Sequence, residues 1–334
     1  MSIHRIAGAL AFAAALALGP GAQAQTTELK LSHFVPPNHT FHKWAVIWAE
    51  QLAKESGGRL KVTIYPAGQL VGPPNRQFDA ARNAIVDMSF TLHGVTPGRY
   101  PIADLTNLPF TYPSAGRTSA VMGKRLTELA PTYLAQEHQG LRILWMAVAP
   151  PVVFNSKVAV RKIDDFKGMK VRYAGAENKK MLDALGAVPL LVPPPEAQDA
   201  LAKGIVDSAL FPYEAALSFD LGSVTKYAIE PGISSASFAF VMNPAKYNSL
   251  PDDLKMLIDK TTGAAAAEGY AKMWDEAEKH GKTQLVGKGL EIITLPDADV
   301  KKIRDLAAPQ IQEAIAAIDK QGKPGRAFYD AYVK

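Results

Sequence analysis

Side chains able to carry out nucleophilic, acid–base or metal chemistry form no known catalytic motif in this sequence. The 334 residues contain no cysteine, which excludes a thiol nucleophile, a disulfide framework, cysteine-bound zinc and an iron–sulfur cluster. No G-x-S-x-G or H-E-x-x-H pattern is present, and no G-x-G-x-x-G follows a predicted strand. His33, His39 and His42 are close in sequence, but no carboxylate joins them at ligand spacing. We therefore predict no catalytic centre, no metal and no cofactor.

The charged residues also exclude one class of partner. There are 37 lysines and arginines against 32 acidic residues, a formal net charge of +5, and no run of five like charges occurs. Nucleic-acid binding would need a dense basic face. We therefore expect no nucleic-acid partner.

The first residues have the pattern of a secretory signal peptide. Arg5 supplies a positive start, Ile6–Leu18 is an apolar run, and Ala22-Gln23-Ala24 is an A-x-A cleavage site. Thirteen apolar residues are too few to cross a bilayer of about 30 Å comfortably. We expect cleavage after Ala24, export, and no stable membrane insertion.

The elements that would position a site alternate between strands and helices. Period-two alternation predicts strands at 28–32 and 59–65, and apolar 85–91 predicts a third. Helical spacing and turn residues place helices between them, which predicts a mostly parallel sheet covered by helices. The strand 141–148 and the break at Pro150-Pro151 end this unit.

A second α/β unit follows, and the chain then returns to the first. Strands are predicted at 152–155, 170–173, 188–192 and 206–211, a returning strand at 238–243, and a long helix from about 249 to 281. We predict one lobe from 25–150 plus about 238–275, and a second from 151–237 plus about 276–334. A cleft between two such lobes is a common ligand site.

Seven segments in register resemble the substrate-binding subunits of TRAP (tripartite ATP-independent periplasmic) transporters. They span nearly the whole chain after residue 24: Ser56–Leu70, Ala84–Met88, Leu108–Phe110, Asp165–Arg172 (DFKGMKVR), Leu185–Glu196, Ala200–Asp207 and Leu250–Leu257. The resemblance implies a periplasmic carrier rather than an enzyme. Its expected fold is a two-lobed α/β periplasmic binding protein fold, with crossing strands and a long helix spanning both lobes. The expected partners are a small organic acid, which the closing lobes would capture, and the membrane permease subunits; we expect a monomer.

Arg172 occupies the arginine of the family's most distinctive motif and is the expected carboxylate anchor. A guanidinium stays charged and offers parallel donors that match a carboxylate. The alternative for Arg172 is an ion pair with an internal carboxylate such as Asp165.

The remaining site residues depart from the sugar-acid pattern of this family. Phe211 stands where those members have a ligand-binding asparagine, and the segments around Val152 and Pro194 are apolar. One charged anchor in an apolar wall indicates a monocarboxylate with a hydrophobic or aromatic tail. Further candidate ligand-binding residues, each with a packing or capping role as its alternative, are Phe34, His93, Tyr213 and Glu214.

The sequence leaves three alternatives open. A dicarboxylate or sugar acid would need further polar anchors, for example Arg99, Asn75 or His93. A secreted lyase or hydrolase would use His93 and Glu214. A carrier could also serve a sensor or another transport class instead of a TRAP permease.

Overall fold

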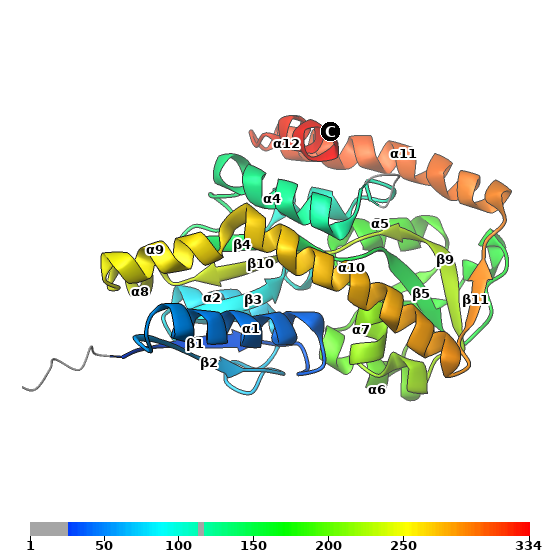
Figure 1. The fold of residues 1–334 in the computed structure, drawn as a ribbon. Coiled ribbons are helices and arrows are strands. Elements are labelled where there is room, and N and C mark those ends of the chain that lie inside the picture. Colours follow the sequence, from blue (N-terminus) through cyan, green and yellow to red (C-terminus); the bar gives the residue numbers. More distant parts are fainter. Residues whose placement is uncertain (1–25, 113–116) are drawn as a thin grey trace, which may run out of the picture.

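The computed structural model describes residues 26–112 and 117–334, so the predicted signal peptide lies outside the described residues. Its strands form two sheets, each with helices on both faces (Figure 1). The first sheet has the order β2-β1-β3-β10-β4. Its strands are β1 (Thr27–His33), β2 (Leu60–Tyr65), β3 (Met88–Leu92), β4 (Arg142–Val148) and β10 (Ser237–Met242). The second sheet has the order β11-β9-β5-β8-β6-β7. Its strands are β5 (Val152–Ser156), β6 (Lys170–Tyr173), β7 (Val188–Leu191), β8 (Ser208–Phe211), β9 (Tyr227–Ser234) and β11 (Glu291–Thr294).

The helices occupy the connections between these strands. The α-helices are α1 (Thr40–Glu55), α2 (Gln77–Arg82), α3 (Pro101–Asp104), α4 (Ser119–Tyr133), α5 (Ala176–Ala184), α6 (Ala197–Ala202), α7 (Tyr213–Ser218), α8 (Pro244–Asn248), α9 (Asp252–Thr261), α10 (Gly263–Gly287), α11 (Asp297–Lys320) and α12 (Gly325–Val333). Short 3-10 turns are η1 (Pro74–Arg76), η2 (His93–Val95), η3 (Leu105–Asn107), η4 (Ile163–Phe166), η5 (Pro194–Glu196) and η6 (Leu221–Ser223). None of the helices in the described part of the chain is both long and apolar enough to cross a membrane.

Each sheet is parallel apart from one reversed strand, and this confirms the predicted architecture. In the first sheet β1 pairs in parallel with β2 and β3, whereas β10 is antiparallel to β3 and β4. In the second sheet β6 is parallel to β7 and β8, and β5 is antiparallel to β8 and β9. The reversed strands β5 and β10 are the ones that the chain enters directly after passing from one sheet to the other.

The two crossing segments lie side by side. The N–H of Ala149 donates to the carbonyl of Ala236, and the hydroxyl of Ser235 donates to the carbonyl of Ala149. A crossing strand leaves one sheet at its carboxyl end and enters the other at the same kind of edge, so it must run against its new neighbours. The carboxyl ends of both sheets therefore face a common cleft.

Alternation along the strands supplies both faces of the first sheet with apolar side chains. On β10, Phe238, Phe240 and Met242 pack with α1 and α10, while Ala239 and Val241 pack with α2 and α4. The second sheet is covered in the same way, by α5 and α11 on one face and by α6 and α7 on the other. Burial on both faces explains the nearly continuous apolar runs of these strands.

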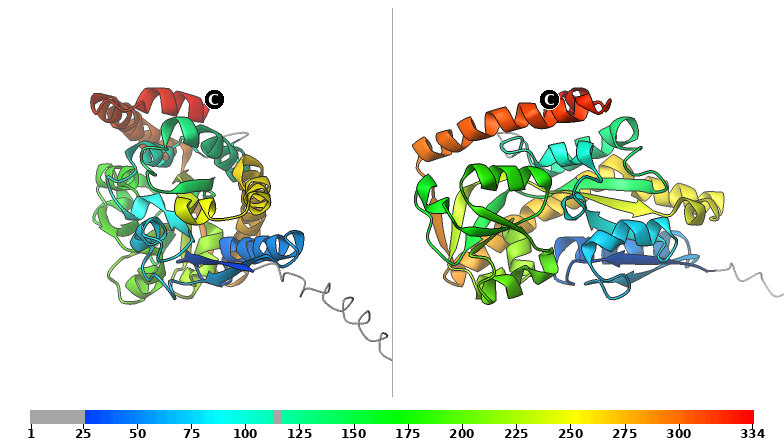
Figure 2. Two further views of the ribbon diagram at one scale, coloured as in Figure 1. Left: turned by 90° about the vertical axis from the view of Figure 1, so that its left-hand side faces the viewer. Right: turned by 180° about the vertical axis from the view of Figure 1, so that it is seen from behind.

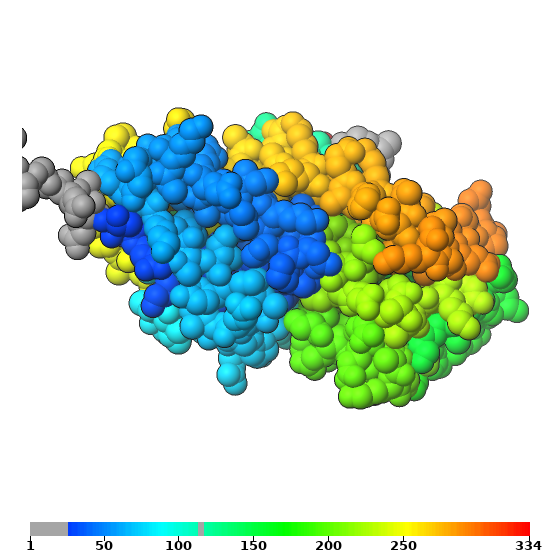
Figure 3. Space-filling model, turned by 60° about the horizontal axis from the view of Figure 1, so that its bottom comes forward, coloured from blue at the N-terminus to red at the C-terminus, as the bar shows by residue number. Residues whose placement is uncertain are grey.

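The molecule has two halves, each consisting of one sheet and the helices packed on it. Helix α10 joins them, because it packs against α4 of the first half and α7 of the second (Figures 1 and 3). The predicted long helix is in fact two helices, α9 and α10, because Gly263 adopts a positive φ of 80°. Gly281 brings α10 against α7, since a Cβ at this position would lie 2.9 Å from the backbone of Tyr213. Figure 3 shows α10 in orange across the seam between the blue N-terminal segments and the green segments.

The C-terminal helices contact both halves. Helix α11 packs against α5, and α12 packs against α4 (Figure 2). Phe328 and Tyr332 of α12 are buried with Met122 and Leu126 of α4. The lobe boundaries stay a prediction, but the contact of α12 with α4 places the end of the chain beside the first sheet rather than wholly with the second.

Candidate functional site

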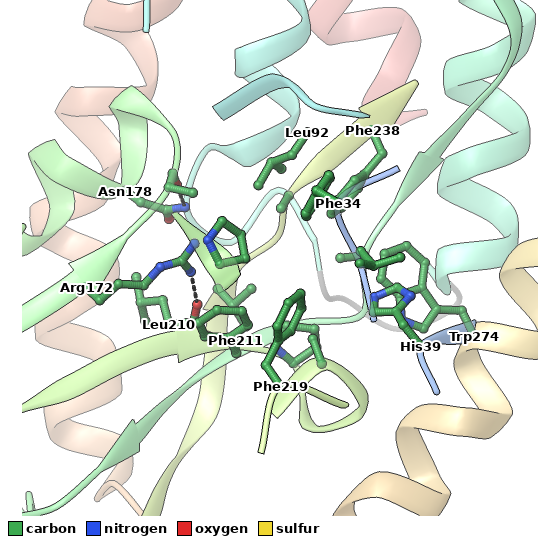
Figure 4. Close-up of a pocket in the computed structure, with 18 residues that line it drawn as sticks. Phe34, His39, Leu92, Arg172, Asn178, Leu210, Phe211, Phe219, Phe238 and Trp274 are labelled. Carbon is green, nitrogen blue, oxygen red and sulfur yellow. Dashed lines mark hydrogen bonds between the residues drawn. The ribbon is translucent and has the colours of Figure 1, made fainter. Parts of the chain in front are cut away.

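A cavity lies between the two sheets (Figure 4). It is lined by Phe34, Val35, His39, Leu92, Ala149, Val152, Arg172, Ala174, Asn178, Pro194, Leu210, Phe211, Pro212, Ala215, Phe219, Ala236, Phe238 and Trp274. Phe34 and Val35 follow β1, Leu92 ends β3 and Phe211 ends β8, so the cavity sits at the carboxyl ends of parallel strands. Open α/β sheets bind ligands at this edge.

Arg172 holds its charge inside this cavity. It lies on β6 and is only 3% exposed. Its Nε donates to the carbonyl of Val192 at 2.8 Å and its Nη1 to the carbonyl of Leu210 at 2.9 Å. Its Nη2 is buried and has no hydrogen-bond partner among the described residues. A donor left unsatisfied in a cavity is available to a ligand.

No carboxylate in the described ranges compensates this guanidinium. The alternative partner Asp165 instead accepts hydrogen bonds from the backbone N–H groups of Arg161 and Lys162. Burial lowers the pKa of Arg172 from its usual value to about 9, so the side chain is still charged at neutral pH. A buried unpaired cation is unfavourable, and an anionic ligand would relieve that penalty.

The rest of the cavity wall is largely apolar and aromatic. The Phe211 ring lies under the guanidinium, with 4.1 Å between the Arg172 Cζ and the ring centroid. Phe219 follows at 5.8 Å between ring centroids, and Phe34 and Phe238 face them from the first sheet (Figure 4). Val152 and Pro194 also line the cavity. The structure thus brings together five of the predicted site residues, whose ligand-binding roles stay predictions: Phe34, Val152, Arg172, Pro194 and Phe211.

Glu214 does not line the cavity but joins the two halves of the molecule behind it. Its Oε1 accepts from the N–H of Thr40 at 2.8 Å and from the Thr40 hydroxyl at 2.9 Å, and its Oε2 accepts from the indole N–H of Trp274 at 3.0 Å. A carboxylate at the N-terminus of α1 is favourable because the first N–H groups of a helix lack intrahelical partners. Glu214 therefore caps a helix, as one of its two predicted roles requires, and this helix is α1.

His39 lines the cavity as a neutral side chain. Its Nδ1 accepts from the N–H of Phe41 at 3.0 Å, and its Nε2 lies 3.3 Å from the Glu214 carboxylate. Burial lowers the pKa of His39, against the opposing effect of Glu214. Because Nδ1 accepts a hydrogen bond, the proton of the neutral ring resides on Nε2, on the side of the Glu214 carboxylate.

Tyr213 and His93 both lie outside the cavity lining. The Tyr213 hydroxyl donates to Glu230 at 2.8 Å. His93 is fully buried, with Nδ1 2.9 Å from the Ser237 hydroxyl and Nε2 3.0 Å from His138 Nε2, and burial lowers its pKa well below the usual value. Internal hydrogen bonds thus occupy these polar groups.

The polar residues required by the alternative ligands also lie elsewhere. Arg99 is paired with Asp79 through two hydrogen bonds, and Asn75 is exposed on η1. His33 Nε2 lies 3.1 Å from His42 Nδ1, and no group of three or more metal-ligating side chains occurs within residues 26–112 and 117–334.

Sequence reasoning missed several lining residues. The sequence predicts a helix that starts at Asn178, a few residues after the strand of Arg172, and this proximity is the signal that points to the site. Phe219, Phe238 and Trp274 come from three separate elements, and only the tertiary fold brings them together.

Comparisons with known proteins give a consistent result. The family described as bacterial extracellular solute-binding protein, family 7, matches residues 31–317. The chain is 26% identical to the outer membrane transporter protein TsaT of Comamonas testosteroni, over 99% of this chain and 98% of that protein.

Two solved structures with bound ligands are similar along most of their length. One is a TRAP solute-binding protein from Rhodoferax ferrireducens T118 in complex with copurified benzoate, 28% identical, with a TM-score of 0.87 and coverage of 92% and 97% of the two chains. The other is a TRAP periplasmic solute-binding protein from Bordetella bronchiseptica with bound (R)- and (S)-mandelate, 28% identical, with a TM-score of 0.84 and coverage of 92% and 98%.

Proposed function

Because the chain belongs to family 7 of the bacterial extracellular solute-binding proteins and is a TRAP transporter substrate-binding subunit, we propose that it captures a small aromatic monocarboxylate for such a transporter. The observation that carries this proposal is the uncompensated guanidinium of Arg172 in a cavity with apolar walls. The carboxylate would meet Arg172, and the ring would fill the space bounded by aromatic side chains.

The energetics favour this class of ligand. An ion pair gains strength where water is excluded, and one anion would neutralise the one charged side chain of the described lining. Aromatic pairs contribute about 0.5–1.5 kcal/mol beyond the burial of their surface. The benzoate and mandelate complexes of the two similar proteins support the same ligand class.

A C4-dicarboxylate or a sugar acid fits the cavity less well. A second carboxylate would need a second cation, yet Arg99 is held by Asp79 and His39 is neutral. Several hydroxyl groups would likewise be left without partners beside Phe34, Phe211 and Phe238, which is costly for buried polar groups. A lyase or hydrolase based on His93 and Glu214 is not supported, because internal contacts hold both side chains.

The partner and the location follow from the family. We propose that the protein acts in the periplasm as a monomer, after cleavage behind Ala24, and that the loaded form docks on the TRAP permease subunits. A sensor or another transport class stays an alternative partner. Genes for the small and large TRAP membrane subunits beside this gene would support the proposal, and a lone histidine kinase gene would favour sensing.

Calorimetric titration of the exported protein with benzoate, mandelate, succinate and a sugar acid tests the ligand class. We expect micromolar or tighter binding of the aromatic monoacids only. Removing one partner of a buried charge pair typically costs about 2–5 kcal/mol, so Arg172→Ala should nearly abolish binding. Arg172→Lys should restore it only in part, since an ammonium lacks the planar set of donors.

A matched control separates a loss of ligand contact from a general effect of removing an arginine. Arg161 is an exposed arginine that pairs with Glu291. Arg161→Ala should bind like the unmodified protein. Tight binding of succinate or a sugar acid with no binding of benzoate would contradict the aromatic assignment and leave the carrier class intact.

A further inference from the structure

Asn178 lies in the same cavity wall as Arg172 (Figure 4). It belongs to the first turns of α5, which begins directly after β6 and the turn at Gly175. Its side chain is part of the cavity lining, and the residue is only 4% exposed. A buried polar side chain in an otherwise apolar wall requires an explanation.

Two hydrogen bonds fix the orientation of the Asn178 amide. The Nδ2 donates to the carbonyl of Ala174 at 2.8 Å, and the Oδ1 accepts from the hydroxyl of Ser234 at 2.5 Å. A carbonyl only accepts, so the nitrogen must face Ala174. A primary amide has two N–H groups, and within the described residues only one of them is used. The second N–H is therefore a free donor beside the cavity.

Arg172 alone cannot present its usual side-on pair of donors to a carboxylate. Such a pair consists of Nε and Nη2, and the Nε–H is already committed to the carbonyl of Val192. The Nη2 is unpartnered, and Nη1 donates one of its two N–H groups to the carbonyl of Leu210. A carboxylate has two oxygens with about four acceptor sites, so it has room for a donor from another residue.

We propose that Asn178 is the second carboxylate-binding residue of this site, that Ser234 positions its amide, and that the pair Arg172–Asn178 selects an ionised carboxylate. This inference rests on the proposed function and deepens it. Because the Oδ1 is turned towards the Ser234 hydroxyl, the group that Asn178 can offer a carboxylate is the second N–H of its amide. An uncharged amide or a protonated acid would place a donor of its own against the donors of Arg172 and Asn178, so it should bind more weakly than the carboxylate.

The test compares Asn178→Asp, Asn178→Ala and Ser234→Ala by calorimetric titration with benzoate, with benzamide as the uncharged analogue. We expect Asn178→Ala to weaken benzoate binding about tenfold. Asn178→Asp keeps the shape but introduces a second carboxylate, and should weaken benzoate binding at least 100-fold at pH 7.5. Ser234→Ala should weaken it several-fold, because the amide can then turn its oxygen to the ligand.

The pH dependence separates ligand contact from a purely structural effect. Lowering the pH from 7.5 to 5.5 should recover part of the benzoate affinity of Asn178→Asp as the introduced carboxyl takes up a proton, and should leave the unmodified protein unchanged. Asn243→Asp is the matched control, because Asn243 is a buried asparagine that bonds Ala81 far from the cavity lining. It should bind benzoate with unchanged affinity.

The outcomes distinguish this inference from the function on which it rests. Benzoate binding within threefold of the unmodified protein in both Asn178→Ala and Asn178→Asp would overturn the role of Asn178 and leave the proposed function standing. If an Asn178 variant fails to fold, Ser234→Ala takes its place: benzoate binding within threefold of the unmodified protein would then overturn the role of Asn178. Failure of the unmodified protein to bind any aromatic acid would overturn both.

Discussion

The backbone N–H of Gly175 donates a hydrogen bond to the carbonyl of Gly94 across the cleft, with 2.9 Å between nitrogen and oxygen. Gly94 follows β3 of the first sheet, and Gly175 follows β6 of the second, three residues after Arg172. A Cβ added to Gly94 would lie 2.5 Å from the nitrogen of Gly175 and 2.8 Å from its Cα. The two halves therefore meet backbone to backbone beside the proposed anchor.

Replacing Gly94 by alanine should keep the lobes from closing completely. The added methyl group meets backbone atoms, which cannot move aside as a flexible side chain would. We expect Gly94→Ala to weaken the binding of an aromatic acid at least tenfold and to reduce the ligand-induced decrease in radius of gyration. Calorimetry and small-angle X-ray scattering measure the two effects.

A glycine elsewhere serves as the control for this substitution. Gly269 lies in α10, and a Cβ there would meet no atom within 4 Å. Gly269→Ala should bind and compact like the unmodified protein. If Gly94→Ala did the same, the contact between Gly94 and Gly175 would have no role in closure.

Glu214→Gln should accelerate ligand release. In the closed arrangement this carboxylate of the second half accepts two hydrogen bonds from Thr40 of the first half and one from Trp274. A glutamine has one acceptor oxygen in place of two and presents an N–H group to Trp274 or Thr40. Charge-assisted hydrogen bonds are worth about 1.5–3 kcal/mol each, so we expect the dissociation rate measured by stopped-flow fluorescence to rise about tenfold or more.

Glu276→Gln provides the comparison for Glu214→Gln, because Glu276 is an exposed glutamate of α10 that pairs with Lys279. Its dissociation rate should match that of the unmodified protein. Equal rates for both variants would show that the contact of Glu214 with α1 does not hold the closed form.

Much of the fold followed from periodicity, and one strand shows where that signal ends. The alternation in β2 and the apolar run of β3 predict these two strands, and the alternation of strands and helices predicts a mostly parallel sheet; both strands do pair in parallel with β1. Strand β9 was missed because Pro231 and Gly232 interrupt its pattern, and both residues disfavour strands. Gly232 is nevertheless required, since a Cβ there would lie 2.7 Å from the Cβ of Pro151 at the crossing between the sheets.

The candidate site likewise has residues that the local sequence predicts and contacts that only the tertiary fold reveals. Arg172 was predicted from its motif, and the apolar character of the wall around Phe211 and Pro194 was apparent from the local sequence. The sequence predicts that Glu214 contacts the ligand or caps the next helix, but its partner Thr40 is 174 residues distant, and no local pattern encodes that distance. The hydrogen bond between Asn178 and Ser234 was missed for the same reason.

Ligand affinity should be constant from about pH 6 to 8. Burial lowers the pKa of Arg172, but only to about 9, so the guanidinium that binds the carboxylate keeps its charge throughout this range. Titrations from pH 5.5 to 8 would check this. Burial also lowers the pKa of His39, so an affinity that rises below pH 6 would contradict its assignment as neutral.

Asp104→Asn should reduce the loss of folding stability between pH 5 and pH 8. Asp104 is buried on α3; desolvation, followed by the charges of Glu137 and Glu177, raises its pKa to about 8. The folded state thus retains a proton that the unfolded state releases near pH 4, so this contribution to stability is present at low pH and is lost as the pH rises towards 8, by up to about 1.4 kcal/mol per unit. In urea unfolding at both pH values, we expect Asp104→Asn to be more stable than the unmodified protein at pH 8.

The exposed Asp164 is the control, and Asp164→Asn should lose as much stability between pH 5 and pH 8 as the unmodified protein. If Asp104→Asn also lost the same amount, the buried, protonated state of Asp104 would be refuted.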